Sequence, residues 1–214
     1  MTSKKLKKFP VIFFLLLFIF ILSNLSDLKA QDPIVTLANL YNQGKYQEAA
    51  DLGIDLLNNY PENKEVYTYI TLSLFRLGQY QKCLTYTKEA LGIFPNDVQF
   101  LKLIGRVYNE IGQYNLAITY FERCLVYNPS DGWSYYYYGK ALFFSTSYYK
   151  AISALNAAIY LGVDQYYPHY YLAYSLYKVS ERNKALSVLE NAMKKYNTNR
   201  LIELYNLIKS ETNH

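Results

Sequence analysis

Residues that build catalytic and metal centres are scarce in this sequence. Its 214 residues include only two histidines, His169 and His214, and the second is the last residue. A histidine-bearing catalytic triad or a multi-histidine metal site therefore cannot be assembled within one chain. No glycine-rich loop is present that would cradle a phosphate. Carboxylate pairs such as Asp51 and Asp55 are typical of a solvated helix face. We therefore expect no enzyme, no cofactor and no metal ion.

Clustered positive charge is also missing from most of the chain. The formal net charge is +5, and within the first thirty residues five lysines less Asp27 account for +4 of it. The remainder of the chain is near neutral. Binding to a phosphate backbone requires clustered Lys and Arg side chains. The sequence thus predicts that nucleic acid is not a partner.

The longest apolar run is too short to cross a bilayer. Val11 to Leu22 are twelve consecutive apolar residues that follow a lysine-rich start. As a helix they rise about 18 Å, less than the roughly 30 Å core of a bilayer. This pattern favours a signal peptide over residues 1–30, cleaved after Ala30, with a mature chain that begins at Gln31. The alternative is a retained anchor at residues 11–22, and only in that case is the membrane a partner.

Export is therefore expected, to the periplasm or the extracellular space. The sequence has no usable Asn-x-Ser/Thr acceptor after residue 30, because Asn128-Pro129-Ser130 is excluded by its proline. This absence favours a bacterial envelope over the eukaryotic secretory pathway.

A spacing of 34 residues organises the chain after residue 30. Three tyrosines and an arginine fill the position of Tyr114 in the other copies: Tyr46, Tyr80, Tyr148 and Arg182. The repeats are residues 30–63, 64–97, 98–131, 132–165 and 166–199. In the third copy, apolar residues at helical spacing predict two helices that are separated at Gly112 and end at Pro129. Gly105 and Ala117 are expected where these helices cross, since larger side chains would hold them apart.

This pattern of small residues, aromatics, Gly-x-Tyr and proline resembles the tetratricopeptide repeat family, whose unit is a 34-residue helix-turn-helix. The resemblance implies an all-α fold, a right-handed α-α solenoid of five repeats over residues 31–199. Residues 200–214 carry apolar side chains at helical spacing and predict a capping helix with a frayed tail. The later copies depart from the pattern, because Thr146 and Ser180 replace the turn glycine and Val163 and Asn197 replace the proline.

The two cysteines fall on small-residue positions of the repeat. Cys83 stands where other copies have alanine, and Cys124 stands at a second such position seven residues further along the repeat. Seven residues span about 10 Å along a helix, whereas a disulfide needs Cα atoms within roughly 7 Å. We therefore expect both to be buried free thiols.

The resemblance implies that the first helix of each repeat lines a concave surface, through its second, fifth, sixth, ninth, twelfth and thirteenth residues. In the third copy these are Gln99, Lys102, Leu103, Arg106, Asn109 and Glu110, a largely polar set. In the fourth copy they are Trp133, Tyr136, Tyr137, Lys140, Phe143 and Phe144. In the fifth copy they are Tyr167, Tyr170, Tyr171, Tyr174, Tyr177 and Lys178.

The fifth copy has more aromatic residues than its packing face needs. His169, Leu172, Ala173 and Leu176 already supply that face, so the tyrosine stripe is a second amphiphilic face on the same helix. Tyrosine offers contact area and a polar group at low entropic cost, which suits an extended peptide, a proline-rich segment or an amphipathic helix. The aromatic set, with Lys102 and Arg106, is the predicted groove for a protein or peptide partner. Alternatively, the rings pack on one another.

Two further interpretations of the function stay open. A glycan-binding module of the envelope would stack the same rings on sugar faces, and an anchored subunit of an envelope complex would retain residues 11–22. Some members of the family hold a partner's C-terminal carboxylate with lysine, arginine and asparagine side chains. Here only Lys102 and Arg106 fit that role, and Ile34, Ala38 and Tyr69 stand where polar groups are needed. That function is therefore not expected.

Overall fold

The computed structural model describes residues 32–210, and the predicted signal peptide and the tail after Ser210 lie outside this range. The described part contains eleven helices and no strand. They are α2 (Pro33–Asn42), α3 (Tyr46–Leu56), α4 (Lys64–Arg76), α5 (Tyr80–Ile93), α6 (Val98–Glu110), α7 (Tyr114–Tyr127), α8 (Gly132–Phe144), α9 (Tyr148–Tyr160), α10 (Tyr166–Lys178), α11 (Arg182–Met193) and α12 (Asn199–Ser210). The predicted all-α solenoid is confirmed. None of these helices is long and apolar enough to span a membrane.

The second helix of every repeat begins at the same position of the 34-residue period, from Tyr46 in the first copy to Arg182 in the last. The first helices of the middle repeats begin directly after a capping side chain. Asn63, Asp97 and Asp131 each accept a hydrogen bond from the backbone N–H two residues later, at 2.9 to 3.1 Å. These caps satisfy donors that the first turn of a helix leaves unpaired.

The crossing of the two helices in each repeat needs a small side chain, as the sequence predicts. Ala49, Cys83, Ala117, Ala151 and Ala185 share one position of the repeat and are all 0% exposed. A Cβ added to Gly105 would lie 2.9 Å from the Phe121 ring in the facing helix. Both cysteines are buried and free, as expected. Burial raises the pKa of the Cys83 thiol to about 11, so this group stays protonated.

The turn between the two helices uses a left-handed residue in all five repeats. Gly44, Gly78 and Gly112 occupy it in the first three, with φ of 77°, 70° and 76°. Thr146 and Ser180 occupy it in the last two, with φ of 62° and 65°. For a residue with a Cβ this conformation costs about 1 kcal/mol. The two late repeats therefore keep the backbone of the turn without the residue that favours it.

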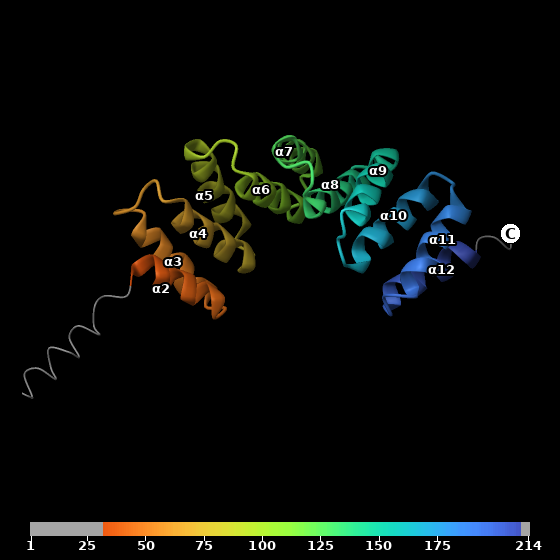
Figure 1. The fold of residues 1–214 in the computed structure, drawn as a ribbon, viewed down its shortest axis with the longest axis horizontal. Coiled ribbons are helices and arrows are strands. Elements are labelled where there is room, and N and C mark those ends of the chain that lie inside the picture. Colours follow the sequence, from red (N-terminus) through yellow and green to blue (C-terminus); the bar gives the residue numbers. More distant parts are fainter. Residues whose placement is uncertain (1–31, 211–214) are drawn as a thin grey trace, which may run out of the picture.

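The stack of repeats is curved. Each first helix contacts the first helix of the next repeat, whereas successive second helices do not contact one another within the described chain. The first helices therefore line the shorter, inner side of the curve. Figure 1 shows the resulting arch, with α5, α7 and α9 toward its outer edge and α6, α8 and α10 nearer its inner side. The following sections call residues 32–131 the N-terminal half and residues 132–210 the C-terminal half.

Candidate partner-binding surface

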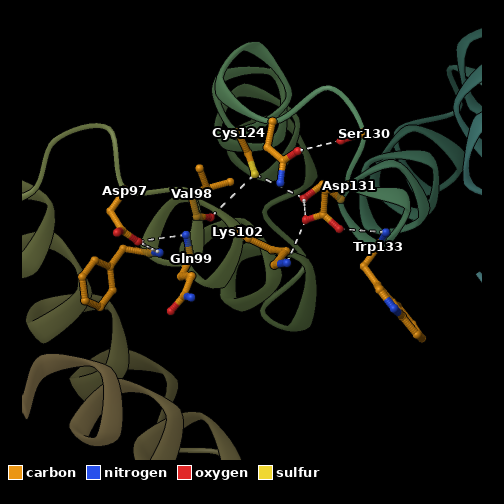
Figure 2. A network of polar contacts seen from close by, with 11 residues as sticks. Asp97, Val98, Gln99, Lys102, Cys124, Ser130, Asp131 and Trp133 are labelled. Atoms are coloured by element: carbon orange, nitrogen blue, oxygen red, sulfur yellow. Dashed lines mark hydrogen bonds and ion pairs between the residues drawn. The ribbon is translucent and has the colours of Figure 1, made fainter. Parts of the chain in front are cut away.

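In the N-terminal half, Lys102 of the inner surface is paired within the chain. The Lys102 ammonium lies 2.7 Å from Asp131 Oδ2, which also accepts a hydrogen bond from Ser134 Oγ at 2.7 Å. Burial tends to raise the pKa of Asp131, but the bonds from Lys102 and Ser134 outweigh it and lower this pKa. Figure 2 shows this network, with the Trp133 indole pointing away from it. Lys102 is thus engaged within the chain.

Arg106 lies between two aromatic rings from neighbouring repeats. Its guanidinium carbon is 4.3 Å from the centroid of Phe75 on α4 and 4.9 Å from that of Tyr137 on α8. Its Nε is buried without a hydrogen-bond partner. This guanidinium therefore joins three repeats through cation–π contacts. Neither Lys102 nor Arg106 is free in the way that a carboxylate-binding clamp needs.

Two residues expected on the inner surface of the third repeat are buried instead. Leu103 and Asn109 are each 4% exposed. Asn109 Nδ2 donates a hydrogen bond to the Tyr137 carbonyl at 3.0 Å, which links α6 to α8. The expectation that these two residues line the concave surface is therefore wrong, because Leu103 belongs to the hydrophobic core and Asn109 packs against α8.

In the C-terminal half, the predicted aromatic residues pack against one another. The Phe143 ring centroid lies 5.2 Å from that of Tyr171 and 5.1 Å from that of Tyr174. Phe144 stacks on Tyr114 of α7 with centroids 5.0 Å apart. Such pairs add stability beyond the area they bury. The rings therefore form a connected layer between α8 and α10.

This mutual packing leaves the predicted residues with unequal access to solvent. Tyr136 is buried at 7% exposure, and burial raises its pKa well above the usual range. Burial also raises the pKa of Tyr171 to about 12. Trp133 and Phe144 are exposed, at 42% and 41%. The remaining tyrosines of the set are half-buried: Tyr137, Tyr167, Tyr170, Tyr171, Tyr174 and Tyr177.

A hollow of about 410 Å³ opens on the inner side between α8, α10 and α12, and it is called the C-terminal hollow below. Five predicted residues line it: Phe143, Phe144, Tyr170, Tyr171 and Tyr174. Four residues of the capping helix complete the lining: Arg200, Glu203, Leu204 and Leu207. The hollow thus combines aromatic side chains of two repeats with one side formed by α12. That side carries one positive and one negative side chain, Arg200 and Glu203.

The other predicted residues lie outside this hollow. Trp133 contacts Tyr136 and Tyr137 near the start of α8, with ring centroids 5.9 and 6.1 Å away. Lys140 is held by Glu110 of α6, with Nζ 3.2 Å from Oε1. Tyr167 lies beside Tyr166, with centroids 4.0 Å apart. Lys102, Arg106 and Tyr177 also lie outside the lining. The residues of the predicted groove therefore fall into two groups, those that line the hollow and those that make separate contacts elsewhere.

Sequence reasoning missed the contribution of α12. The sequence predicts only a cap there, and Leu201, Leu204 and Ile208 are indeed buried against the last repeat. Leu207 is 46% exposed and lies off that packing face, and an apolar residue at such a position is a signal that could have revealed a second role. Among residues 32–210, no cluster of histidine, cysteine and acidic residues could hold a metal ion.

Comparisons with known proteins agree with the repeat architecture. The family model described as anaphase-promoting complex, cyclosome, subunit 3 matches residues 42–124. No curated protein matches the sequence. MamA from Desulfovibrio magneticus RS-1 superposes with a TM-score of 0.70 at 23% identity, over 77% of this chain and 95% of that one. A thermophilic TPR protein of Thermus thermophilus gives 0.60 at 18% identity, over 84% and 97%.

At these identities the likeness to solved structures concerns the fold. Three features of the chain indicate the same fold independently of these comparisons. They are the 34-residue period, the small residues at each crossing and the left-handed turns. Together these observations show that residues 32–210 have the fold of tetratricopeptide repeat proteins.

Proposed function

We propose that this protein is an exported scaffold that binds a peptide or partner protein on the inner side of its C-terminal half. The observation that carries the proposal is the C-terminal hollow, where predicted aromatic residues of two repeats and residues of α12 surround one open volume. Ligand sites are typically concave, mostly apolar and supplied with a few polar groups. The proposal includes no catalytic step.

The exposed apolar side chains at the hollow support this function. Phe144 and Leu207 come from helices far apart in the sequence and line the same hollow while remaining 41% and 46% exposed. Exposed apolar residues gathered at a concavity mark interaction sites more often than single exposed ones do. The half-buried rings beside them already pack on one another, and a surface that is ordered before binding lowers the entropic cost of binding.

Export and location in a bacterial envelope are part of the proposal. They are supported by the lysine-rich start and the apolar run from Val11 to Leu22. Sequencing the N-terminus of the protein from cells would test this part, with Gln31 as the expected first residue. A first residue upstream of Val11 would favour the anchored alternative.

The binding surface is tested by replacing Phe144→Ser together with Leu207→Ser. Helical content should be kept, and the thermal midpoint should fall modestly because Phe144 loses its stack on Tyr114. Partner affinity should fall about tenfold or more because two central apolar contacts are lost. The measurement is affinity capture from the native envelope, followed by titration of the purified partner.

A matched control uses two exposed apolar residues of α7 that do not line the hollow. Leu116 and Val126 are 44% and 77% exposed. Their replacement by serine should leave partner affinity unchanged. Equal loss of affinity in both double variants, or no loss in either, would contradict the proposed surface.

A further inference from the structure

The first repeat carries a negative charge that the other repeats lack. Residues 32–63 contain five acidic residues and one lysine, which gives a net charge of −4. Three of the acids, Glu48, Asp51 and Asp55, lie at helical spacing along one exposed face of α3. At the equivalent positions of the other four repeats, Glu89 is the only acid. This face of α3 is called the acidic face below.

Within residues 32–210 the acidic face is weakly compensated. Lys45 Nζ lies 3.9 Å from Glu48 Oε2, near the limit of an ion pair. Asp51 accepts a hydrogen bond from the uncharged Gln47 at 2.9 Å, and in this part of the chain neither Asp51 nor Asp55 forms an ion pair. Like charges at this spacing on a helix repel one another. A positively charged surface of another molecule would therefore be attracted to the acidic face.

The last repeat carries the largest positive charge. The net charges of the second to fifth repeats are +1, 0, +1 and +3, and residues 200–210 add +1. Two lysines of the last repeat form ion pairs, Lys184 with Glu181 at 3.1 Å and Lys195 with Asp164 at 2.6 Å. Glu181 is included in the +3, and counting Asp164 as well leaves the C-terminal end at +3. The two ends of the chain thus have opposite charges of similar size.

Both ends of the solenoid also lack a neighbouring repeat. Within the described chain α2 contacts only α3 and α4, and α12 contacts only α10 and α11. The terminal helices of a solenoid need polar outer faces to stay in solution alone. However, α2 has no charged side chain, and Val35 on α2 and Ile202 on α12 are 47% and 40% exposed. Each charged end therefore also presents apolar surface to solvent.

The charges favour contact between unlike ends. Figure 1 shows α2 and α12 at opposite ends of the arch, so the two ends of one molecule do not meet. Contact between like ends of two molecules would place acid against acid or base against base. Complementary charges guide association and disfavour such wrong arrangements. The favoured contact is therefore head to tail, and it extends into a chain or closes into a ring.

We propose that this protein associates with itself head to tail, with the acidic face of α3 and the uncovered α2 of one copy against the basic end, α11 and α12, of the next. The partner at this surface is thus a second copy of the chain. Ile202 does not line the C-terminal hollow. The inference therefore goes beyond the proposed function and does not depend on it.

The first test is analytical ultracentrifugation of the purified protein over a range of concentrations, in about 0.05 M and about 0.5 M salt. In low salt the mean mass should rise with concentration to at least twice that of the monomer. In high salt the association should be about tenfold weaker or more, because salt screens surface charges. A monomer at every concentration in low salt, or association that salt leaves unchanged, would overturn the inference.

Charge reversal tests which surfaces meet. Asp51→Lys with Asp55→Lys makes both ends basic, and Lys184→Glu with Lys194→Glu makes both ends acidic. All four side chains are exposed, and circular dichroism would check that each double variant folds. Each variant alone should be monomeric in low salt, whereas an equimolar mixture of the two should associate again. Association of either variant alone, or a mixture that stays monomeric, would contradict head-to-tail contact.

A matched control reverses two exposed lysines in the middle of the chain. Lys82 and Lys88 lie on the outer side of α5. Lys82→Glu with Lys88→Glu changes the net charge of the protein as much as the C-terminal variant does, and it should leave self-association within about twofold of the original. Equal loss of association in this control would show that total charge, and not the two ends, governs association, and would refute the proposal.

Discussion

The two halves of the solenoid share one backbone design but differ in what their inner sides present. In the N-terminal half, glycine occupies each turn, and Lys102 and Arg106 are both engaged within the chain. In the C-terminal half, Thr146 and Ser180 occupy the turns and an open hollow lies among aromatic rings. The difference shows that helix packing can hold a repeat in shape after its local turn signal is lost.

This contrast has a consistent energetic basis. A left-handed residue other than glycine costs about 1 kcal/mol or more. The small residues at the helix crossings of the late repeats are as fully enclosed as those of the early ones, so the late repeats keep this packing. The C-terminal half therefore tolerates weak turns, while its inner side is the more aromatic of the two.

The largest predicted effect tests whether both halves depend equally on close helix crossings. A Cβ at Gly139 would lie 2.6 Å from Leu155 Cγ, and one at Gly105 would lie 2.9 Å from the Phe121 ring. Gly139→Ala and Gly105→Ala should each lower the free energy of unfolding by about 2 kcal/mol, because the added methyl group overpacks the crossing. Urea denaturation followed by circular dichroism measures this.

Gly92 of α5 provides the control for these two variants. A Cβ at this position meets nothing within 4 Å. Gly92→Ala should therefore raise the free energy of unfolding by up to about 1 kcal/mol, through helix propensity alone. A neutral Gly139→Ala beside a damaging Gly105→Ala would show that the late repeats are packed more loosely than the account requires.

A smaller effect is expected at the turns and has opposite signs in the two halves. Thr146→Gly and Ser180→Gly should each stabilise the protein by about 1 kcal/mol, because glycine adopts positive φ without steric cost. Gly112→Thr, the reverse change in the N-terminal half, should destabilise it by a similar amount. Thermal unfolding of the three variants would check the signs, and destabilisation by Thr146→Gly would show that the threonine side chain has another role.

Sequence reasoning reached the fold because the 34-residue period is local and repeated. The period places the start of each second helix, and it places Cys83 and Cys124 at enclosed positions without knowledge of the tertiary structure. The period also places the left-handed turn residues Thr146 and Ser180. The intrinsic propensity of threonine and serine opposes this conformation, and the neighbouring helices fix the backbone there.

The candidate site was less accessible to the same reasoning. Periodicity finds the residues that lie on a face, but the fraction of each ring that is covered depends on how adjacent repeats tilt. For this reason Tyr136 is buried while Phe144 is exposed. The packing register of α12 is offset from the repeat period, so Glu203 and Leu207 could not be assigned to the hollow from spacing. The stacking of Arg106 likewise joins three helices that are distant in sequence.

The most direct test of the central claim is hydroxyl-radical footprinting of the protein with and without its captured partner, read by mass spectrometry. If the inner side of the C-terminal half is the binding surface, oxidation of Phe144 and Leu207 falls in the complex, since both side chains are exposed at the hollow in the free protein. Oxidation of Leu116 and Val126 on α7 stays unchanged. Protection of Leu116 and Val126, with Phe144 and Leu207 still fully oxidised, would contradict the account.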